Sequence, residues 1–187
     1  MTNFIKICIA FALILICYGA YSQPLPTDPE TGKVSYAGGD TVSNDVKQKD
    51  LYFRALKWFE VSLDKEASDL EVKDKKTGEL QGTGTTAIPM ETKDGVKQVQ
   101  VNFRVTILSS DSIYTYKITD ITYQEFPTSG NPNPTVTPVE RASKSAGQEE
   151  YASKINIAML GLEENLNNGM RYGQCEQYKW MKRYGFE

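Results

Sequence analysis

The chain has 187 residues, with 21 lysines and arginines against 24 aspartates and glutamates, which is the size of one ordinary domain. It contains no histidine, and this excludes histidine-based catalytic triads, histidine zinc sites and histidine pH switches. The weak negative charge argues against nucleic-acid binding, because neutralising phosphates requires a surplus of basic side chains.

Residues 1–22 are predicted to be a secretory signal peptide. A lysine is followed by an apolar run and then by small residues where a signal peptidase cleaves. We therefore expect cleavage before Gln23, export, and a periplasmic or extracellular location. Two alternatives are a membrane anchor, although the run is shorter than the roughly 20 residues of a spanning helix, and a lipid on Cys17, although Ile16 before it is large for lipoprotein processing.

Cleavage would leave Cys175 as the only cysteine, since Cys8 and Cys17 lie in the signal peptide. No intramolecular disulfide could then form. In an oxidising compartment a lone thiol is either shielded or pairs with another chain. The second case would make the protein a structural envelope component held to a partner through Cys175.

An N-terminal arm, a strand and a helix are predicted next. Residues 23–33 hold three prolines and a glycine and predict an extended arm that leads to a turn. An alternating strand follows over 34–42, and Ser43 or Asn44 is expected to cap a helix over 47–63. The apolar residues of this helix recur at helical spacing and predict a broad buried face, formed by Leu51, Tyr52, Ala55, Leu56, Trp58, Phe59 and Leu63.

Three turn signals predict a four-strand antiparallel meander that completes a core domain over 34–126. They are Thr77-Gly78, Asp94-Gly95 and the polar cluster 109–112, and each separates two strand-like runs. The sequence Gly82-Thr-Gly84-Thr lies inside one of these runs and lacks the lysine of a phosphate-binding loop. We interpret its glycines as positions of close packing.

The strand over 96–108 alternates strictly, with valines, Phe103 and Ile107 on one face and polar residues on the other. This pattern predicts an antiparallel strand with its apolar side on the helices and its polar side open. The strand over 113–126 changes its alternation near Asp120, which predicts a β-bulge.

The rest of the chain is predicted to be a loop, a helix and a tail. Residues 127–148 are rich in proline, glycine and serine and predict a long exposed connection. Apolar residues at helical spacing then predict a helix over 149–169 that stops at Gly169, with Glu149-Glu150 and Glu163-Glu164 on its solvated face. The tail, 170–187, interleaves aromatic and basic residues.

Three stretches resemble a known family: Leu25-Pro-Thr-Asp-Pro-Glu-Thr-Gly-Lys-Val34, the helix Lys49-Asp-Leu-Tyr-Phe-Arg-Ala-Leu-Lys-Trp-Phe59 and the strand Tyr114-Thr-Tyr-Lys-Ile-Thr-Asp120. The chain is similar to secreted bacterial proteins grouped as domain of unknown function 4468, with a TBP-like fold. The resemblance covers roughly 25–123. It implies an α+β, TBP-like β-α-β4-α arrangement, in which a curved antiparallel sheet has helices packed on one face. It implies no activity, cofactor or catalytic residue.

No catalytic, metal-binding or cofactor-binding constellation is visible in the sequence. The expected function is that of a non-enzymatic binding or scaffolding module, with an unknown protein or glycan of the cell envelope as its partner. The candidate binding face is the polar side of the sheet, formed by Gln98, Gln100, Asn102, Arg104 and Lys117.

Two further possibilities concern carboxylates and the tail. Two acidic side chains in one cleft would make the protein a hydrolase of envelope carbohydrate. In the tail, Tyr178, Trp180 and Arg183 are candidate contacts, because aromatic and basic side chains together suit a protein, a glycan or peripheral contact with a membrane. The alternative for the tail is that its aromatic residues complete the core.

Overall fold

The computed structural model describes residues 25–92, 95–127, 131–142 and 149–173. The predicted signal peptide, Cys175 and the candidate tail contacts Tyr178, Trp180 and Arg183 lie outside these residues. In chain order the elements are β1 (Tyr36–Thr41), α2 (Gln48–Leu63), a 3-10 turn (Ala67–Asp69), β2 (Val72–Asp74), β3 (Glu79–Thr92), β4 (Gly95–Ser109), β5 (Ile113–Glu125), β6 (Thr137–Pro138), α3 (Val139–Ala142) and α4 (Glu149–Tyr172).

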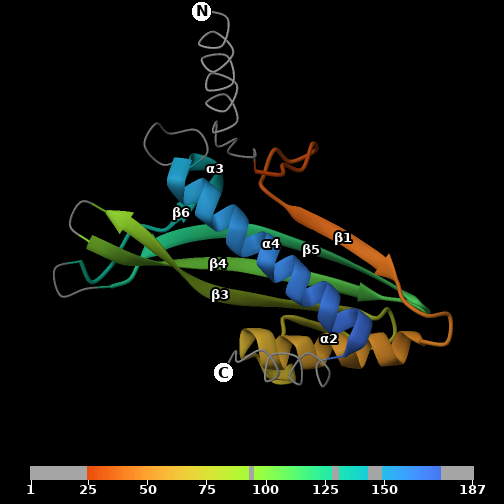
Figure 1. Cartoon of the computed structure of the whole chain (residues 1–187). Helices are drawn as coiled ribbons and strands as arrows, with labels where there is room; N and C mark the ends of the chain where they lie inside the picture. The colour runs from red at the N-terminus through yellow and green to blue at the C-terminus, as the bar shows by residue number, and fades with distance from the viewer. Residues whose placement is uncertain (1–24, 93–94, 128–130, 143–148, 174–187) are drawn as a thin grey trace, which may run out of the picture.

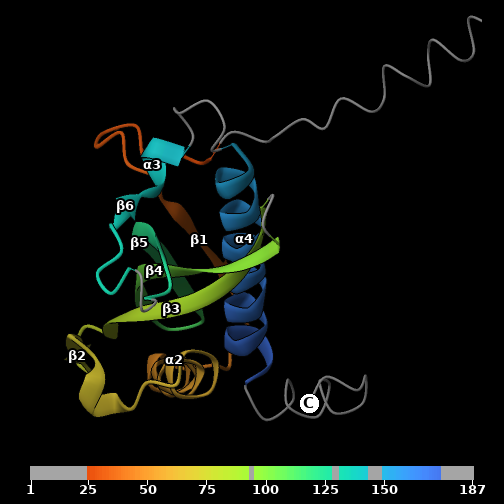
Figure 2. The ribbon, with the colours of Figure 1, turned by 90° about the vertical axis from the view of Figure 1, so that its left-hand side faces the viewer.

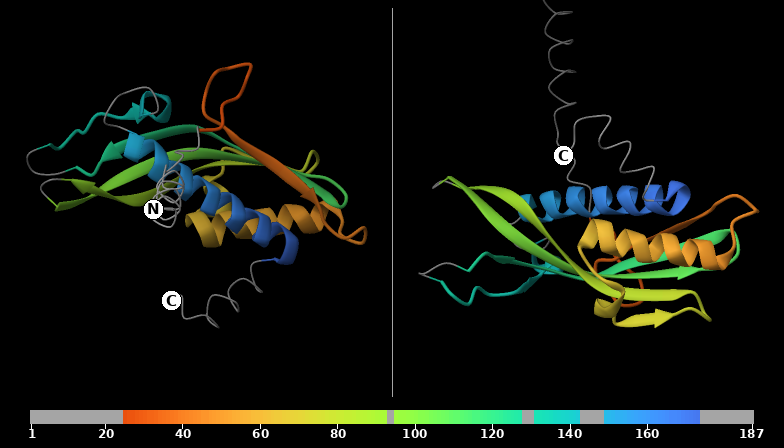
Figure 3. Two further views of the ribbon diagram at one scale, coloured as in Figure 1. Left: turned by 45° about the horizontal axis from the view of Figure 1, so that its top comes forward. Right: turned by 90° about the horizontal axis from the view of Figure 1, so that it is seen from below.

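The strands form one antiparallel sheet in the order β1-β5-β4-β3-β2, and β6 also pairs with β5 (Figure 1). The three predicted hairpins are confirmed, since β2 pairs with β3, β3 with β4, and β4 with β5. Both long helices lie on the same side of this twisted sheet (Figures 2 and 3). The predicted α+β, TBP-like arrangement is therefore confirmed.

The core lies between this side of the sheet and the two helices. Val99, Val101 and Val105 are fully buried, as the alternation of β4 predicts. Trp58 and Phe59 of α2 are also fully buried and meet edge to face. The other face of the sheet is not covered by α2 or α4, and we call it the open face.

The predicted β-bulge is confirmed near Asp120. Asn102 pairs with Thr122 and Arg104 with Thr119, so β5 has one residue more than β4 between these pairs. Asp120 has a left-handed backbone, with φ +52°. Because of the extra residue, the apolar side chains before and after the bulge both face the core although their positions have opposite parity.

The predicted caps of α2 are wrong. The helix begins at Gln48, and Lys47 rather than Ser43 or Asn44 is its N-cap residue. Asp111, in the turn between β4 and β5, accepts a 2.9 Å hydrogen bond from the Gln48 backbone N–H. One of the orphan N–H groups of the helix start is thus satisfied by a side chain from elsewhere in the fold.

The C-terminal third differs from the sequence prediction in two ways. The connection 127–148 is not entirely an exposed loop, because it contains β6 and α3, and Val139 and Ala142 are fully buried. α4 continues past Gly169 to Tyr172. Arg54 stabilises this longer end by donating hydrogen bonds of 2.7 and 2.8 Å to the carbonyl oxygens of Met170 and Arg171 in the last turn.

Candidate functional site

The open face carries all five candidate binding residues predicted from the sequence. Gln98, Gln100, Asn102 and Arg104 alternate along β4 with buried residues, and Lys117 projects from the same face of β5. Each side chain is exposed or half-buried. The strand alternation therefore brings these residues to one surface, as predicted.

Uncharged side chains of the open face hydrogen-bond to one another, both along β4 and between β3 and β4. Asn102 Oδ1 accepts a 2.9 Å hydrogen bond from Gln100 Nε2 and a 3.0 Å hydrogen bond from Thr85 Oγ1. Closer to β2, Gln81 Nε2 donates to Thr106 Oγ1 at 3.2 Å. These contacts hold amides and hydroxyls flat against the sheet, where their remaining donors and acceptors can meet a ligand.

Arg104 is engaged within the protein. Its Nη1 lies 2.9 Å from Glu71 Oε2 and its Nε lies 3.2 Å from Asp120 Oδ2, while Lys33 Nζ lies 3.6 Å from Asp120 Oδ1. The guanidinium thus joins the segment before β2 to the bulge of β5. Its charge is matched by carboxylates, which leaves the centre of the open face without a surplus of positive charge.

Lys117 is also paired, through Asp28 in the N-terminal arm. The Lys117 Nζ lies 2.7 Å from Asp28 Oδ2, and this hydrogen bond is the largest cause that lowers the pKa of Asp28 to about 2. Asp28 Oδ1 accepts hydrogen bonds from the N–H groups of Glu30 and Thr31, which closes the turn that the sequence predicts within the arm. The arm therefore rests against the open face at β5.

Apolar side chains lie at both ends of the open face and were missed in the sequence reading. Val96 and Phe126 are at one end, with 67% and 42% of their surfaces exposed, and Leu108 and Ile113 are at the other, with 46% and 45% exposed. Val99 of β4 pairs with Glu125 of β5. Phe126, the next residue after Glu125, therefore lies opposite Gln98 on β4. The strand alternation could have identified them, because their positions alternate with the buried residues in the same way as those of the polar residues on the open face.

The geometry of the sheet agrees with the sequence comparison. Residues 40–124 match the model of "Domain of unknown function (DUF4468) with TBP-like fold". Residues 40–124 belong to the DUF4468 family. No curated protein matches the chain.

Two solved structures share the fold of this DUF4468 domain. A DUF4468 family protein from Bacteroides ovatus is 13% identical, with a TM-score of 0.62, over 81% of this chain and 91% of that chain. A TBP-like protein from Parabacteroides distasonis is 14% identical, with a TM-score of 0.60, over 79% of this chain and 97% of that chain. At these identities the likeness shows the fold alone.

Neither of two pockets in the described part of the protein brings two carboxylates together. A pocket of about 410 Å³ lies between α2, α4 and the sheet and has no acidic lining residue, and another of about 260 Å³ beside β5 has Glu125 alone. Among the described residues, no three histidine, cysteine or acidic side chains are grouped to hold a metal ion. In the same ranges, no helix is long and apolar enough to cross a membrane.

The sequence prediction placed Glu163 on the solvated face of the helix, and this prediction is wrong. Glu163 is half-buried and accepts a 3.0 Å hydrogen bond from the Tyr116 hydroxyl, and burial raises its pKa. Tyr36 likewise donates to the buried Asn156 at 2.8 Å, and Tyr114 to Asn167 at 2.8 Å. These contacts join α4 to β1 and β5 through polar groups, which is a structural role.

Proposed function

We propose that the protein is an exported, non-enzymatic binding or scaffolding module whose open face binds a glycan or a protein of the cell envelope. One observation carries the proposal: the open face is uncovered by α2 and α4, is rich in amides and hydroxyls, and has its central cations paired with the protein's own carboxylates. Such a surface suits a polar ligand without strong charge.

The chemistry of the surface narrows the kind of ligand. Gln98 and Gln100 offer both donors and acceptors, which suit sugar hydroxyls or the amides of another protein. The exposed ring of Phe126 at the same end adds an apolar contact beside these polar groups. Phosphate-rich polymers are disfavoured, because Arg104 and Lys117 would have to leave their partners to bind them.

Pull-down from a cell-envelope extract tests the proposal. The triple variant Gln98→Ala, Gln100→Ala, Asn102→Ala removes the polar groups of the open face and leaves the paired cations in place. At about 0.5–1.5 kcal/mol for each hydrogen bond, we expect at least a roughly tenfold loss of capture. Treating the extract with protease distinguishes the ligands, since capture of a glycan survives it and capture of a protein does not.

A matched control places three substitutions on the helix side, at the exposed residues Lys49, Glu60 and Glu164, each changed to alanine. We expect this variant to capture the partner as the unchanged protein does. Equal capture by both triple variants would overturn the proposed binding face.

Export is a separate proposal, supported by the predicted signal peptide. N-terminal sequencing of the protein from the envelope or the medium is expected to begin at Gln23. A protein that keeps its first 22 residues and stays in the cytoplasm would overturn this proposal.

A further inference from the structure

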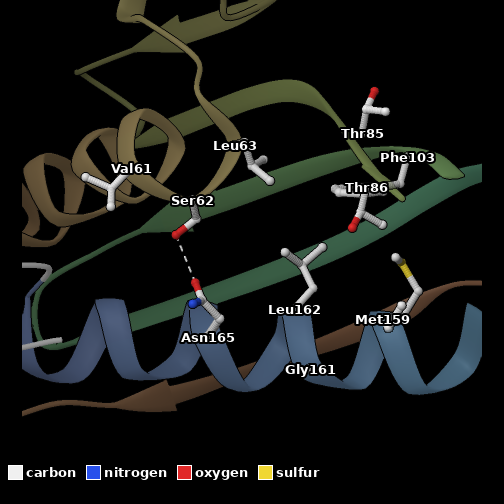
Figure 4. Close-up of a pocket in the computed structure, with 11 residues that line it drawn as sticks. Val61, Ser62, Leu63, Thr85, Thr86, Phe103, Met159, Gly161, Leu162 and Asn165 are labelled. Atoms are coloured by element: carbon white, nitrogen blue, oxygen red, sulfur yellow. Dashed lines mark hydrogen bonds between the residues drawn. The ribbon is translucent and has the colours of Figure 1, made fainter. Parts of the chain in front are cut away.

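A pocket of about 410 Å³ opens between the C-terminal end of α2 and the middle of α4, on the side of the sheet opposite the open face. Leu63 of α2, Met159 and Leu162 of α4, and Phe103 of β4 contribute apolar surface to it (Figure 4). We call it the helix pocket. Val61, another lining residue, leaves half of its surface exposed.

α4 carries Gly161 at the edge of the helix pocket. Glycine is the least favourable residue inside a helix apart from proline. A Cβ added at Gly161 would meet nothing within 4 Å, so no described neighbour explains the glycine. At about 100° per residue, Gly161 lies between Ala158, which lines the pocket, and Ile157, which is 67% exposed. The missing side chain leaves a flat strip where another segment can approach the helix backbone closely.

The end of α4 directs the chain away from the helix axis. Gly173 has φ +73° and donates a 2.9 Å hydrogen bond to the carbonyl oxygen of Gly169, which is the geometry of a left-handed helix cap. Arg54 and Asp40 fix this end of α4 through the two carbonyls described above and through Arg171. The last fourteen residues, 174–187, therefore start from a fixed point and a turn.

The length of this C-terminal segment matches the distance to the helix pocket. Twelve residues of helix separate Gly161 from Gly173, which is about 18 Å. Seven extended residues lead from Gly173 to Trp180 and span up to about 23 Å. Trp180 can therefore reach the level of Gly161 if the segment runs back along α4.

The composition of the segment also matches the pocket. Besides Trp180, the segment contains three more aromatic residues and three basic ones. The C-terminal end of α2 carries partial negative charge from its last carbonyls, and α2 has no basic residue in its last turn. The segment supplies both the apolar rings for the pocket and the cations for this helix end.

We propose that residues 174–187 fold back along α4 and dock in the helix pocket, with Trp180 beside Gly161. The occupant is this chain's own C-terminal segment. Docking assigns the aromatic residues of the segment to the helix side and leaves the open face to the external ligand.

Tryptophan fluorescence of the purified protein tests the docking, because the chain has two tryptophans, Trp58 and Trp180. The fully buried Trp58 is present in both the unchanged protein and Trp180→Phe. Subtracting the emission spectrum of the variant from that of the unchanged protein therefore gives the emission of Trp180. We expect this emission to be blue-shifted from that of the urea-unfolded protein and to be protected from acrylamide. Neither property should change with protein concentration.

Substitutions in the pocket should release Trp180. Val61→Arg places a charge in the pocket wall, and we expect a red shift of Trp180 emission and loss of its protection. Gly161→Leu fills the flat strip without charge, adds a Cβ that meets no atom within 4 Å, and favours the helix, so it should release Trp180 in a protein that still folds. Ile113→Arg, at an equally exposed apolar residue of the open face, is the matched control and should leave the emission unchanged.

Three results would overturn the proposal. Trp180 emission in the unchanged protein could equal that of the unfolded chain. It could be blue-shifted yet insensitive to both pocket variants, which would place Trp180 elsewhere. Its blue shift could require high protein concentration or added anionic vesicles, which would make a second copy or a membrane the occupant.

Discussion

Asn165 joins the two long helices through a single oxygen atom. Its Oδ1 accepts a 2.7 Å hydrogen bond from Trp58 Nε1. The same oxygen accepts a 2.9 Å hydrogen bond from Ser62 Oγ (Figure 4). Asn165→Ala removes this acceptor from both donors. Trp58 is fully buried, so this variant leaves its N–H without a protein partner, beside the helix pocket that Asn165 also lines.

The expected loss of stability follows from these two donors. An unpaired buried donor costs about 1–3 kcal/mol, and Ser62, being partly exposed, adds less. We therefore predict that Asn165→Ala lowers the free energy of unfolding by about 2–3 kcal/mol. With a urea slope of about 2 kcal/mol/M, the unfolding midpoint should fall by about 1 M.

Equilibrium unfolding in urea checks this prediction. Asn165→Asp keeps an oxygen acceptor for both donors and should lose less than the alanine variant. Asn168→Ala, three residues further along α4, is the control for the loss of an asparagine and should stay within about 0.5 kcal/mol of the unchanged protein. If Asn165→Ala stays within the same limit, the reasoning about the buried donor is refuted.

Three other substitutions give clear expectations. Gly84→Val should destabilise the protein by about 1–3 kcal/mol in urea unfolding, because even a Cβ would lie 2.5 Å from the ring of the buried Phe103, and an unchanged midpoint would contradict this packing. Lys117→Met should raise the pKa of Asp28 from about 2 towards its ordinary value in an NMR titration, and a pKa that stays low would exclude the ion pair of Asp28 and Lys117. Because the pKa of Asp28 is lower in the folded protein than in the unfolded one, the pair stabilises the protein above the unfolded pKa, and this stabilisation is lost as the pH falls towards 2. Glu163→Gln should not destabilise the protein near neutral pH. Burial raises the pKa of this carboxyl, so ionising it as the pH rises through that pKa costs the folded protein stability. A marked fall of the unfolding temperature of the variant at neutral pH would contradict this direction.

The alternation of β4 and the helical spacing in α2 were sufficient to predict the layers of the fold. These are short-range patterns, in which the identity of every second residue, or of every third and fourth, reports the direction of the core. The same alternation placed Gln98 and Asn102 on the open face. The change of alternation at Asp120 also predicted the bulge, because the apolar residues on either side must reach the same core.

Contacts between distant residues could not be predicted in this way. Asp111 caps α2 from 63 positions away, and Asp28 meets Lys117 across 89 positions. Local patterns carry no information about such partners. For the same reason Arg54 was not foreseen as the group that stabilises the end of α4 beyond Gly169.

Footprinting with hydroxyl radicals tests the role of the open face most directly, since it measures the exposure of individual side chains with and without envelope extract. Val96 and Phe126 report on the end of the open face that carries Gln98 and Gln100, and Ile157 reports on α4; all three are at least 42% exposed in the protein. We predict that the extract protects Val96 and Phe126 and leaves the oxidation of Ile157 unchanged. Protection of Ile157 with continued oxidation of Val96 and Phe126 would contradict the assignment of binding to the open face.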